Sequence, residues 1–346
     1  MEARMSVLCV TSINSGDGKT AFCAGVTLLS KKLGKQIDAV KPLNISELTE
    51  PDNDATFLAS ISGTENQPGW PDLAKSHSNN AQLLSEVPKI IKRILSIKND
   101  VIVELPSLSD GGKDRSSIPI ELIEGLEGEV ILIASYSRKL TSKLIIGSAN
   151  RIGKKLAGVI VNQVPRYRYK ETESALQHDL TSVGINVLGF IPEERSLQGV
   201  TVGQIAEHLG GEYLLGEDKK NQLFDNVLIG GIVLDNGVEY FNLNETKAVL
   251  VRADRPDIQM AALKTPTKCL VLTGGHKPVQ YIEHEAREES VPVIMVKQGT
   301  LESSRELDTL FQSSTVHHNE KAETFASLIE KHFDIEALSP IIGWTS

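Results

Sequence analysis

The stretch Ser15-Gly16-Asp17-Gly18-Lys19-Thr20 follows the apolar run 6–11 and precedes apolar residues at helical spacing from Ala21 onward. Glycines let backbone N–H groups close around a polyphosphate, and the positive end of the next helix adds to the attraction. A lysine here suits the β- and γ-phosphates, and a threonine hydroxyl suits Mg²⁺. The order strand, loop, helix predicts a phosphate-binding loop over 15–21, although Ile13 stands where the full pattern has its first glycine.

Length and charge limit the class of protein. A chain of 346 residues with 40% hydrophobic content can bury a sizeable core and predicts two domains. The net charge of −9 argues against a nucleic-acid partner, which would need clustered basic residues. The sequence has no apolar run long enough to span a membrane and no leader-type segment at its start, so we expect a soluble, cytoplasmic protein without a membrane partner.

Short β-branched runs alternate with longer amphipathic ones up to about residue 210, which is typical of parallel strands joined by helices. We therefore expect an α/β fold, a parallel sheet sandwiched by helices over 1–215, followed by a smaller α/β domain over 222–335. The polar stretch 44–80 is interpreted as a long irregular excursion, and Pro88 is expected to end or kink a helix. The expected strands are 6–11, 38–41, 100–105, 129–135, 158–162 and 186–191, then 226–233, 247–252, 269–273 and 291–296, and a closing helix is expected over 318–333.

Polar residues at strand ends are the next candidates for chemistry. Lys41 ends the second expected strand, at the edge where parallel sheets bind ligands, and could pair with a phosphate or an anionic substrate. Glu104 interrupts an apolar strand, and a buried carboxylate needs a partner such as Mg²⁺. Asp52 and Asp54 could also reach a metal, or be merely solvated. Asn162 could meet a base edge, or simply form a turn after its strand.

Gly18-Lys19-Thr20, Lys41-Pro42, Glu104, Val159-Ile160-Val161-Asn162 and Gly189-Phe190-Ile191-Pro192-Glu193 together resemble the dethiobiotin synthetase and cobyrinic acid amidase type of phosphate-loop ATPase. The resemblance covers about the first 210 residues and implies a P-loop NTPase fold that binds ATP and Mg²⁺. It further implies that Lys19 and Thr20 bind phosphates and that Lys41 contacts phosphate and substrate. Asp52 or Asp54 together with Glu104 would help hold Mg²⁺, and Asn162 would lie near the adenine.

The second half resembles the DRTGG domain through Asp254-Arg255 after one strand and Thr273-Gly274-Gly275 after the next. Gly274 and Gly275 are expected to expose backbone N–H groups, and Arg252 and Arg255 could fork onto a phosphate or carboxylate. The alternative is that Asp254 and Arg255 form an internal ion pair that shapes a turn. The two resemblances together are similar to the amino-terminal portion of long-form phosphotransacetylases.

Three functions follow from these features. The leading one is an ATP-binding module with a regulatory DRTGG domain and weak or absent hydrolysis, acting on a separate acyltransferase. It is favoured because the turn after Glu104 lacks the Glu-Gly-x-Gly-Gly of dethiobiotin synthetases. The others are an ATP-dependent ligase that activates a carboxylate, with Lys19 and Lys41 as catalytic residues, and a nucleotide sensor acting through the DRTGG loops. Residues 335–346 leave no room for an acetyl-transferring module, so acetyl transfer is not expected, whereas a homodimer is plausible.

Overall fold

The protein forms two compact units in a computed structural model that describes residues 6–43, 53–64, 80–109, 117–231, 237–342 and 344. Unit 1 consists of Met1–Glu193 together with Val316–Ser346, and unit 2 consists of Glu194–Thr315. Unit 2 is therefore an insertion in the sequence of unit 1. Within the described ranges, no helix has both the length and the apolar character needed to cross a bilayer.

Unit 1 is built on a six-stranded sheet in the order β2-β3-β1-β4-β5-β6, and every neighbouring pair is parallel. Parallel strands all point their carboxyl ends at the same edge, so polar residues that follow different strands are gathered there. The confirmed parallel sheet consists of β1 (Val7–Ser12), β2 (Ile37–Val40), β3 (Asp100–Glu104), β4 (Glu129–Ser135), β5 (Leu156–Val164) and β6 (Val187–Pro192).

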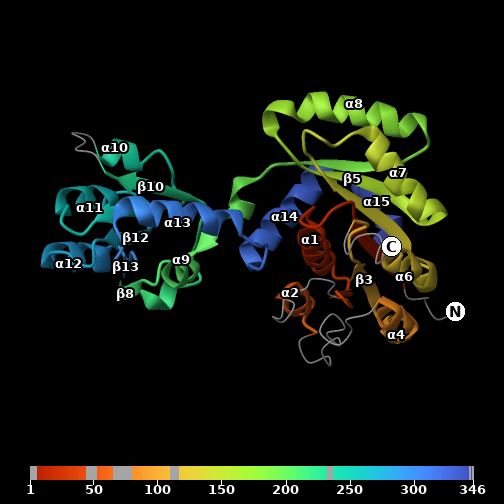
Figure 1. The fold of residues 1–346 in the computed structure, drawn as a ribbon, viewed down its shortest axis with the longest axis horizontal. Helices are drawn as coiled ribbons and strands as arrows, with labels where there is room; N and C mark the ends of the chain where they lie inside the picture. The colour runs from red at the N-terminus through yellow and green to blue at the C-terminus, as the bar shows by residue number, and fades with distance from the viewer. Residues whose placement is uncertain are drawn as a thin grey trace. The chain divides into compact units, whose positions relative to one another are not determined.

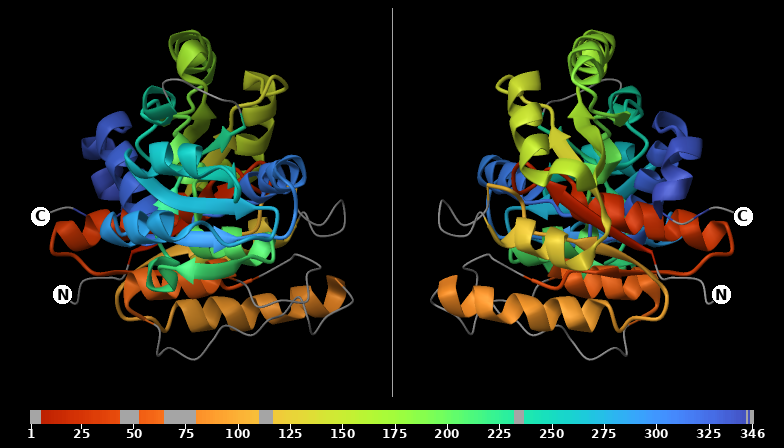
Figure 2. Two further views of the ribbon diagram at one scale, coloured as in Figure 1. Left: turned by 90° about the vertical axis from the view of Figure 1, so that its left-hand side faces the viewer. Right: turned by 90° about the vertical axis from the view of Figure 1, so that its right-hand side faces the viewer.

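Helices cover both faces of this sheet because each strand is apolar on both sides (Figure 1). On one face, alternate residues of each strand, such as Val101, Val103 and Val159, pack with apolar residues of the covering helices. In Figure 2, α4 is the long orange helix that packs against α6. The helices of this face are α4 (Asn80–Ile94), α6 (Ile118–Leu126), α7 (Ser142–Ile152) and α8 (Tyr169–Ser182).

Two helical segments differ from the sequence-based expectation. α2 (Asn53–Ser62) lies within 44–80, which was expected to be irregular, because Phe57, Leu58 and Ile61 form a buried helical face that stabilises it. α4 continues through Pro88 to Ile94 and keeps its buried face, so the helix does not end at the proline, and a kink there stays a prediction. A proline removes one backbone hydrogen bond, and tertiary packing can outweigh that cost.

The C-terminal segment covers α1 (Lys19–Lys32), which follows the predicted phosphate loop. α14 (Asn319–His332) lies along α1 (Figure 1), and the Phe22 and Phe333 rings stack with centroids 6.0 Å apart. α15 (Ile335–Ile342) follows, and Trp344 Nε1 donates to Ser30 Oγ at 2.7 Å. The predicted closing helix is therefore present, but it packs in unit 1.

Unit 2 is a five-stranded sheet in the order β10-β11-β12-β13-β8, with only β8 antiparallel. Alternate residues face opposite sides: Leu250 and Val271 pack with α9 and α13, whereas Val249 and Leu272 pack with α11 and α12. The strands are β8 (Glu212–Leu215), β10 (Asn226–Gly230), β11 (Lys247–Arg252), β12 (Thr267–Thr273) and β13 (Val293–Met295), besides the small pair β7 (Val200–Thr201) and β9 (Leu223–Phe224). The helices are α9 (Val202–His208), α10 (Gly237–Phe241), α11 (Pro256–Leu263), α12 (Gln280–Glu288) and α13 (Thr300–Gln312).

The bounds of the units differ from the expected domains 1–215 and 222–335 at two places. The chain leaves unit 1 at Glu193, so 194–215 belong to unit 2, where β8 completes the sheet. The chain returns to unit 1 at Val316. There α14 buries the apolar surface of α1 that the sheet leaves uncovered.

The close approach of the returning segment to the sheet requires a glycine at position 189. Gly189 forms a bridge with Phe333, and an added Cβ would lie 2.6 Å from the carbonyl oxygen of His332. We predict that Gly189→Ala destabilises unit 1 by about 1–3 kcal/mol, the usual cost of overpacking. Urea unfolding followed by tryptophan fluorescence measures this, since both tryptophans belong to the sequence of unit 1.

Gly147→Ala is the matched control, because an added Cβ on this helical glycine meets nothing within 4 Å. Alanine in a helix interior should stabilise by about 0.5–1 kcal/mol relative to glycine. Equal unfolding curves for Gly189→Ala and the wild type would contradict the described packing of the returning segment.

Candidate functional site

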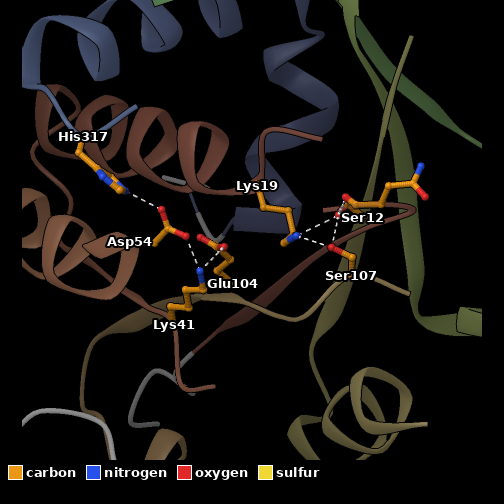
Figure 3. A network of polar contacts seen from close by, with 8 residues as sticks. Ser12, Lys19, Lys41, Asp54, Glu104, Ser107 and His317 are labelled. Atoms are coloured by element: carbon orange, nitrogen blue, oxygen red, sulfur yellow. Dashed lines mark hydrogen bonds and ion pairs between the residues drawn. The ribbon is translucent and has the colours of Figure 1, made fainter. Parts of the chain in front are cut away.

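The candidate site lies at the carboxyl edge of the unit 1 sheet. Ser12 ends β1, Glu104 ends β3 and Lys41 directly follows β2, and these three strands are neighbours in the sheet. Figure 3 shows two groups of contacts at this edge, one around Lys19 and one around Lys41. The strand order therefore brings together residues that are far apart in the sequence.

The predicted phosphate loop connects β1 to α1 and is held in a specific conformation. Gly16 and Gly18 have φ values of 81° and 98°, which glycine adopts without strain. Asp17 Oδ2 accepts a hydrogen bond from the Asn14 N–H at 2.8 Å and so closes the loop on itself. Burial raises the pKa of this Asp17 carboxyl, and the Asn14 N–H opposes the shift.

Asn162, expected near an adenine, lies beneath the loop. Its Nδ2 donates to the Asp17 carbonyl at 2.9 Å, and its Oδ1 accepts from the Gln163 N–H at 2.9 Å. An added Cβ on Gly18 would lie 2.3 Å from Asn162 Nδ2, so a larger residue would displace the Asn162 amide and would also be strained at a φ of 98°. In this arrangement the Asn162 amide shapes the loop, and contact with a base stays a prediction.

Lys19, at the first position of α1, has a buried ammonium with neutral partners. Its Nζ donates to Ser107 Oγ at 2.7 Å and to Ser12 Oγ at 3.0 Å. Only 8% of the residue is exposed, and the first turn of α1 contains no acidic residue. A desolvated cation at a helix N-terminus, without a bonded carboxylate among the described residues, is suited to an incoming anion.

Lys41 forms the second group, in which a cation joins two carboxylates (Figure 3). Its Nζ donates to Asp54 Oδ2 and lies 3.5 Å from Glu104 Oε1. Asp54, on α2, also bonds through Oδ1 to His317 Nε2 at 2.6 Å. The structure therefore brings together the predicted Lys41, Asp54 and Glu104 and adds His317, whereas Asp52 lies outside the described residues.

The two carboxylates have opposite pKa shifts. Burial is the largest influence on Glu104, which is 2% exposed, and raises its pKa against the opposing charge of Lys41. Burial also acts to raise the pKa of Asp54, but the hydrogen bond from His317 and the charge of Lys41 outweigh it. The pKa of Asp54 is therefore lowered well below its ordinary value.

Mg²⁺ fits the oxygen donors on one side of the site. Glu104 Oε2 is buried and has no hydrogen-bond partner within the described part of the chain, and the Thr20 hydroxyl acts to lower the pKa of the same carboxyl. Mg²⁺ prefers such hard oxygens and usually keeps water and phosphate ligands as well. Asp54 is less suitable because Lys41 and His317 engage its oxygens. No group of three or more His, Cys, Asp or Glu residues forms a metal cluster in the described ranges.

Two residues of the site are not predicted from the sequence. Ser107 lies in the turn after Glu104, and its role depends on the neighbouring positions of β1 and β3. His317 lies 263 positions from its partner Asp54, and no local motif marks it. Only the folding of the returning segment onto unit 1 reveals its position.

The loops predicted to bind a ligand in unit 2 are engaged internally. Gly274 and Gly275 are exposed residues, but their N–H groups donate to the carbonyls of Gln298 and Val296 at 3.0 and 2.9 Å and so are already engaged within unit 2. The expected ion pair between Asp254 and Arg255 is replaced by two others. Arg252 forms a hydrogen-bonded ion pair with Asp254, and Arg255 forms one with Asp257. Thr273 Oγ1 lies 2.8 Å from Thr300 Oγ1.

A parallel sheet whose first strand leads through a glycine-containing loop into a helix beginning Lys19-Thr20 defines a P-loop NTPase domain. Residues 6–201 match the family model described as "AAA domain", and residues 204–310 match that described as "DRTGG domain". The first match covers more than half of the chain, so the protein belongs to this AAA domain family, in its dethiobiotin synthetase-like P-loop form, and carries a DRTGG domain. The predicted family resemblance and the predicted α/β fold class are confirmed.

The curated relatives are distant and mostly longer. The phosphate acetyltransferase of Haemophilus influenzae is 22% identical over 96% of this chain and 52% of its own length. The chain therefore spans about half the length of this relative. The ATP-dependent dethiobiotin synthetase BioD of Bacillus cereus is 24% identical over 54% of this chain and 84% of its own length.

Among solved structures, the CBS and DRTGG domains of the regulatory region of Clostridium perfringens pyrophosphatase, complexed with the activator diadenosine tetraphosphate, are 22% identical. The match covers 36% of this chain and 51% of that chain, with a TM-score of 0.30.

The opposite pKa shifts predict opposite effects of pH. The folded-state pKa of Asp54 lies below its unfolded value of about 3.9, so its stabilising contribution is present above that pH and is lost as the pH falls. Glu104 has a raised folded-state pKa, so it stabilises while protonated and loses that contribution as the pH rises above about 4.3.

Asp54→Asn should therefore reduce the free energy of unfolding at pH 7 by about 1 kcal/mol, and this difference should shrink only as the pH falls below about 3.9. Glu104→Gln should become more stable than the wild type, also by about 1 kcal/mol, as the pH rises from about 4 to about 8. Urea unfolding of the ligand-free protein from about pH 2.5 to pH 8 measures both effects. Parallel pH profiles for the two variants would contradict the assignment.

Proposed function

We propose that this protein binds ATP with Mg²⁺ in unit 1 and acts as a nucleotide-responsive regulatory module together with its DRTGG unit. The observation that carries the proposal is the buried Lys19 ammonium, which has two neutral hydroxyls as partners at the N-terminus of α1. A cation in this position is stabilised when the phosphates of a nucleotide replace the lost water.

In this proposal, one set of residues binds the phosphates and another holds the metal ion. The loop over 15–18 and Lys19 would receive the β- and γ-phosphates, and Thr20 and Glu104 would hold Mg²⁺. The ion would neutralise phosphate charge. Lys41 would remain beside Glu104 and lower the cost of its buried charge, because the Lys41 ammonium lies 3.5 Å from the carboxylate.

A regulatory role is favoured over a catalytic one by the region around Lys41. Both Asp54 and Glu104 lie close to its ammonium, which leaves this cation less suited to an anionic substrate than an uncompensated lysine. The chain spans about half of the length of the phosphate acetyltransferases it is similar to. We propose an acyltransferase as a partner and a homodimer as the assembly.

The second candidate is an ATP-dependent ligase that activates a carboxylate as an acyl phosphate. The similarity to a dethiobiotin synthetase over 84% of that enzyme's length supports it. In this function Lys41 would have to exchange one of its carboxylate partners for the substrate anion. Lys19 and Mg²⁺ would stabilise the charge that develops on the phosphoryl group.

Calorimetric titration with ATP, with and without Mg²⁺, tests the proposal. We predict micromolar to submillimolar binding that weakens without Mg²⁺, and a loss of affinity of about tenfold to a hundredfold in Lys19→Ala, since a charge-assisted hydrogen bond contributes about 1.5–3 kcal/mol. Lys32→Ala is the matched control, because Lys32 lies on the same helix but is exposed near Glu330. Unchanged affinity in Lys19→Ala would overturn the nucleotide site.

Phosphate release measured on the same samples separates the two candidates. Binding with negligible turnover supports the regulatory module. Turnover that appears only after a carboxylic acid or a diamine is added would instead support the ligase, and Lys41→Ala should then abolish it.

A further inference from the structure

The C-terminal segment contributes a residue to the contacts around the nucleotide site. His317 lies just before α14 and contacts two residues of α2: Asp54 through a hydrogen bond of 2.6 Å, and Phe57 through rings whose centroids are 5.4 Å apart. Asp54 and Phe57 are three positions apart and therefore lie on the same side of the helix. His317 is thus fixed by both a polar and an apolar contact.

The hydrogen bond has a defined direction. Asp54 has a lowered pKa and is ionised at neutral pH, and an ionised carboxylate only accepts hydrogen bonds. His317 Nε2 must therefore carry a hydrogen and donate it to Oδ1. With Oδ1 engaged, Oδ2 is directed to Lys41, whose ammonium also lies near Glu104 (Figure 3).

The same short stretch of chain is attached to unit 2. Ser314 Oγ donates to the Gly199 carbonyl at 2.9 Å, and the Ser314 N–H donates to the Phe311 carbonyl at the end of α13. Unit 2 ends at Thr315, so Thr315 and Val316 alone separate this attachment from His317. An extended chain spans at most about 3.6 Å per residue, so the two residues between these attachments allow the segment to lengthen only slightly.

We propose that His317 is a positioning residue that couples unit 2 to the phosphate site by holding Asp54, and through it Lys41 and Glu104. This proposal rests on the proposed nucleotide binding. A movement of α13 pulls on the 314–317 segment and weakens the bond to Asp54, which releases Lys41 and alters the surroundings of Glu104. Coupling is reciprocal, so ATP at the site must also alter the end of α13.

Two variants separate the hydrogen bond from the packing. His317→Leu keeps an apolar side chain against Phe57 but cannot donate to Asp54, whereas His317→Gln keeps an N–H donor. His332→Ala is the matched control, because it removes a contact of the same returning segment, with Tyr169 at 3.3 Å, without touching Asp54. Circular dichroism establishes that each full-length variant is folded, and tryptophan fluorescence reports on unit 1 in addition.

Hydrogen exchange of the full chain, with and without Mg²⁺ and ATP, is the readout, with calorimetry of ATP on the same samples. In the wild type, we expect ATP to slow exchange over 309–319 by about fivefold or more, within the range of typical coupling energies. His317→Leu should lose the part of this response that lies in unit 2, residues 309–315, and bind ATP about fivefold more weakly. His317→Gln should restore both, and His332→Ala should behave as the wild type.

The failures can be told apart. If the wild type binds ATP and His317→Leu shows the wild-type response over 309–315, the coupling is wrong while nucleotide binding stands. A failure of His317→Gln to restore the response would also overturn it, because the donor would then not be the cause. If the wild type does not bind ATP, the proposed function fails, and the coupling fails with it.

Discussion

The burial of α1 is the constraint on which the rest of unit 1 depends. This helix carries Lys19 and Thr20 at one end, and ten of its residues are buried, including Phe22 and Val26. A helix that is apolar on most sides must be covered on most sides. The sheet covers one side and α14 another, so the helix that holds the phosphate site is fixed by sequence segments about 300 residues apart.

A second constraint is electrostatic. Two lysines and two acidic residues gather where β1, β2 and β3 end and where α1 and α2 begin, and Glu104 interacts with both lysines. Each buried charge costs stability unless another charge or a polar group compensates it. Hydroxyls compensate Lys19, whereas carboxylates compensate Lys41. The site is therefore divided into a region that can accept an anion and a region whose cation is already paired with carboxylates.

The sequence predicts most of the sheet because alternating runs of apolar residues mark parallel strands, and the predicted strand 129–135 matches β4 in both bounds. The sequence also predicts the loop, since Gly18-Lys19-Thr20 has a specific local context. It does not reveal what the helix at 319–332 packs against, nor His317 as a partner of Asp54, because these depend on contacts between distant segments. It also misses α2, whose buried Phe57 and Leu58 are few among many polar neighbours.

The insertion of unit 2 also has a consequence for how the chain acquires its structure during synthesis. All the strands of unit 1 precede residue 194, yet α1 remains partly uncovered until α14 has left the ribosome. Unit 2 is contiguous and can fold as soon as Thr315 emerges, whereas unit 1 needs contacts of very high sequence separation, which form slowly. The nascent protein can therefore complete its inserted unit before α14 covers α1.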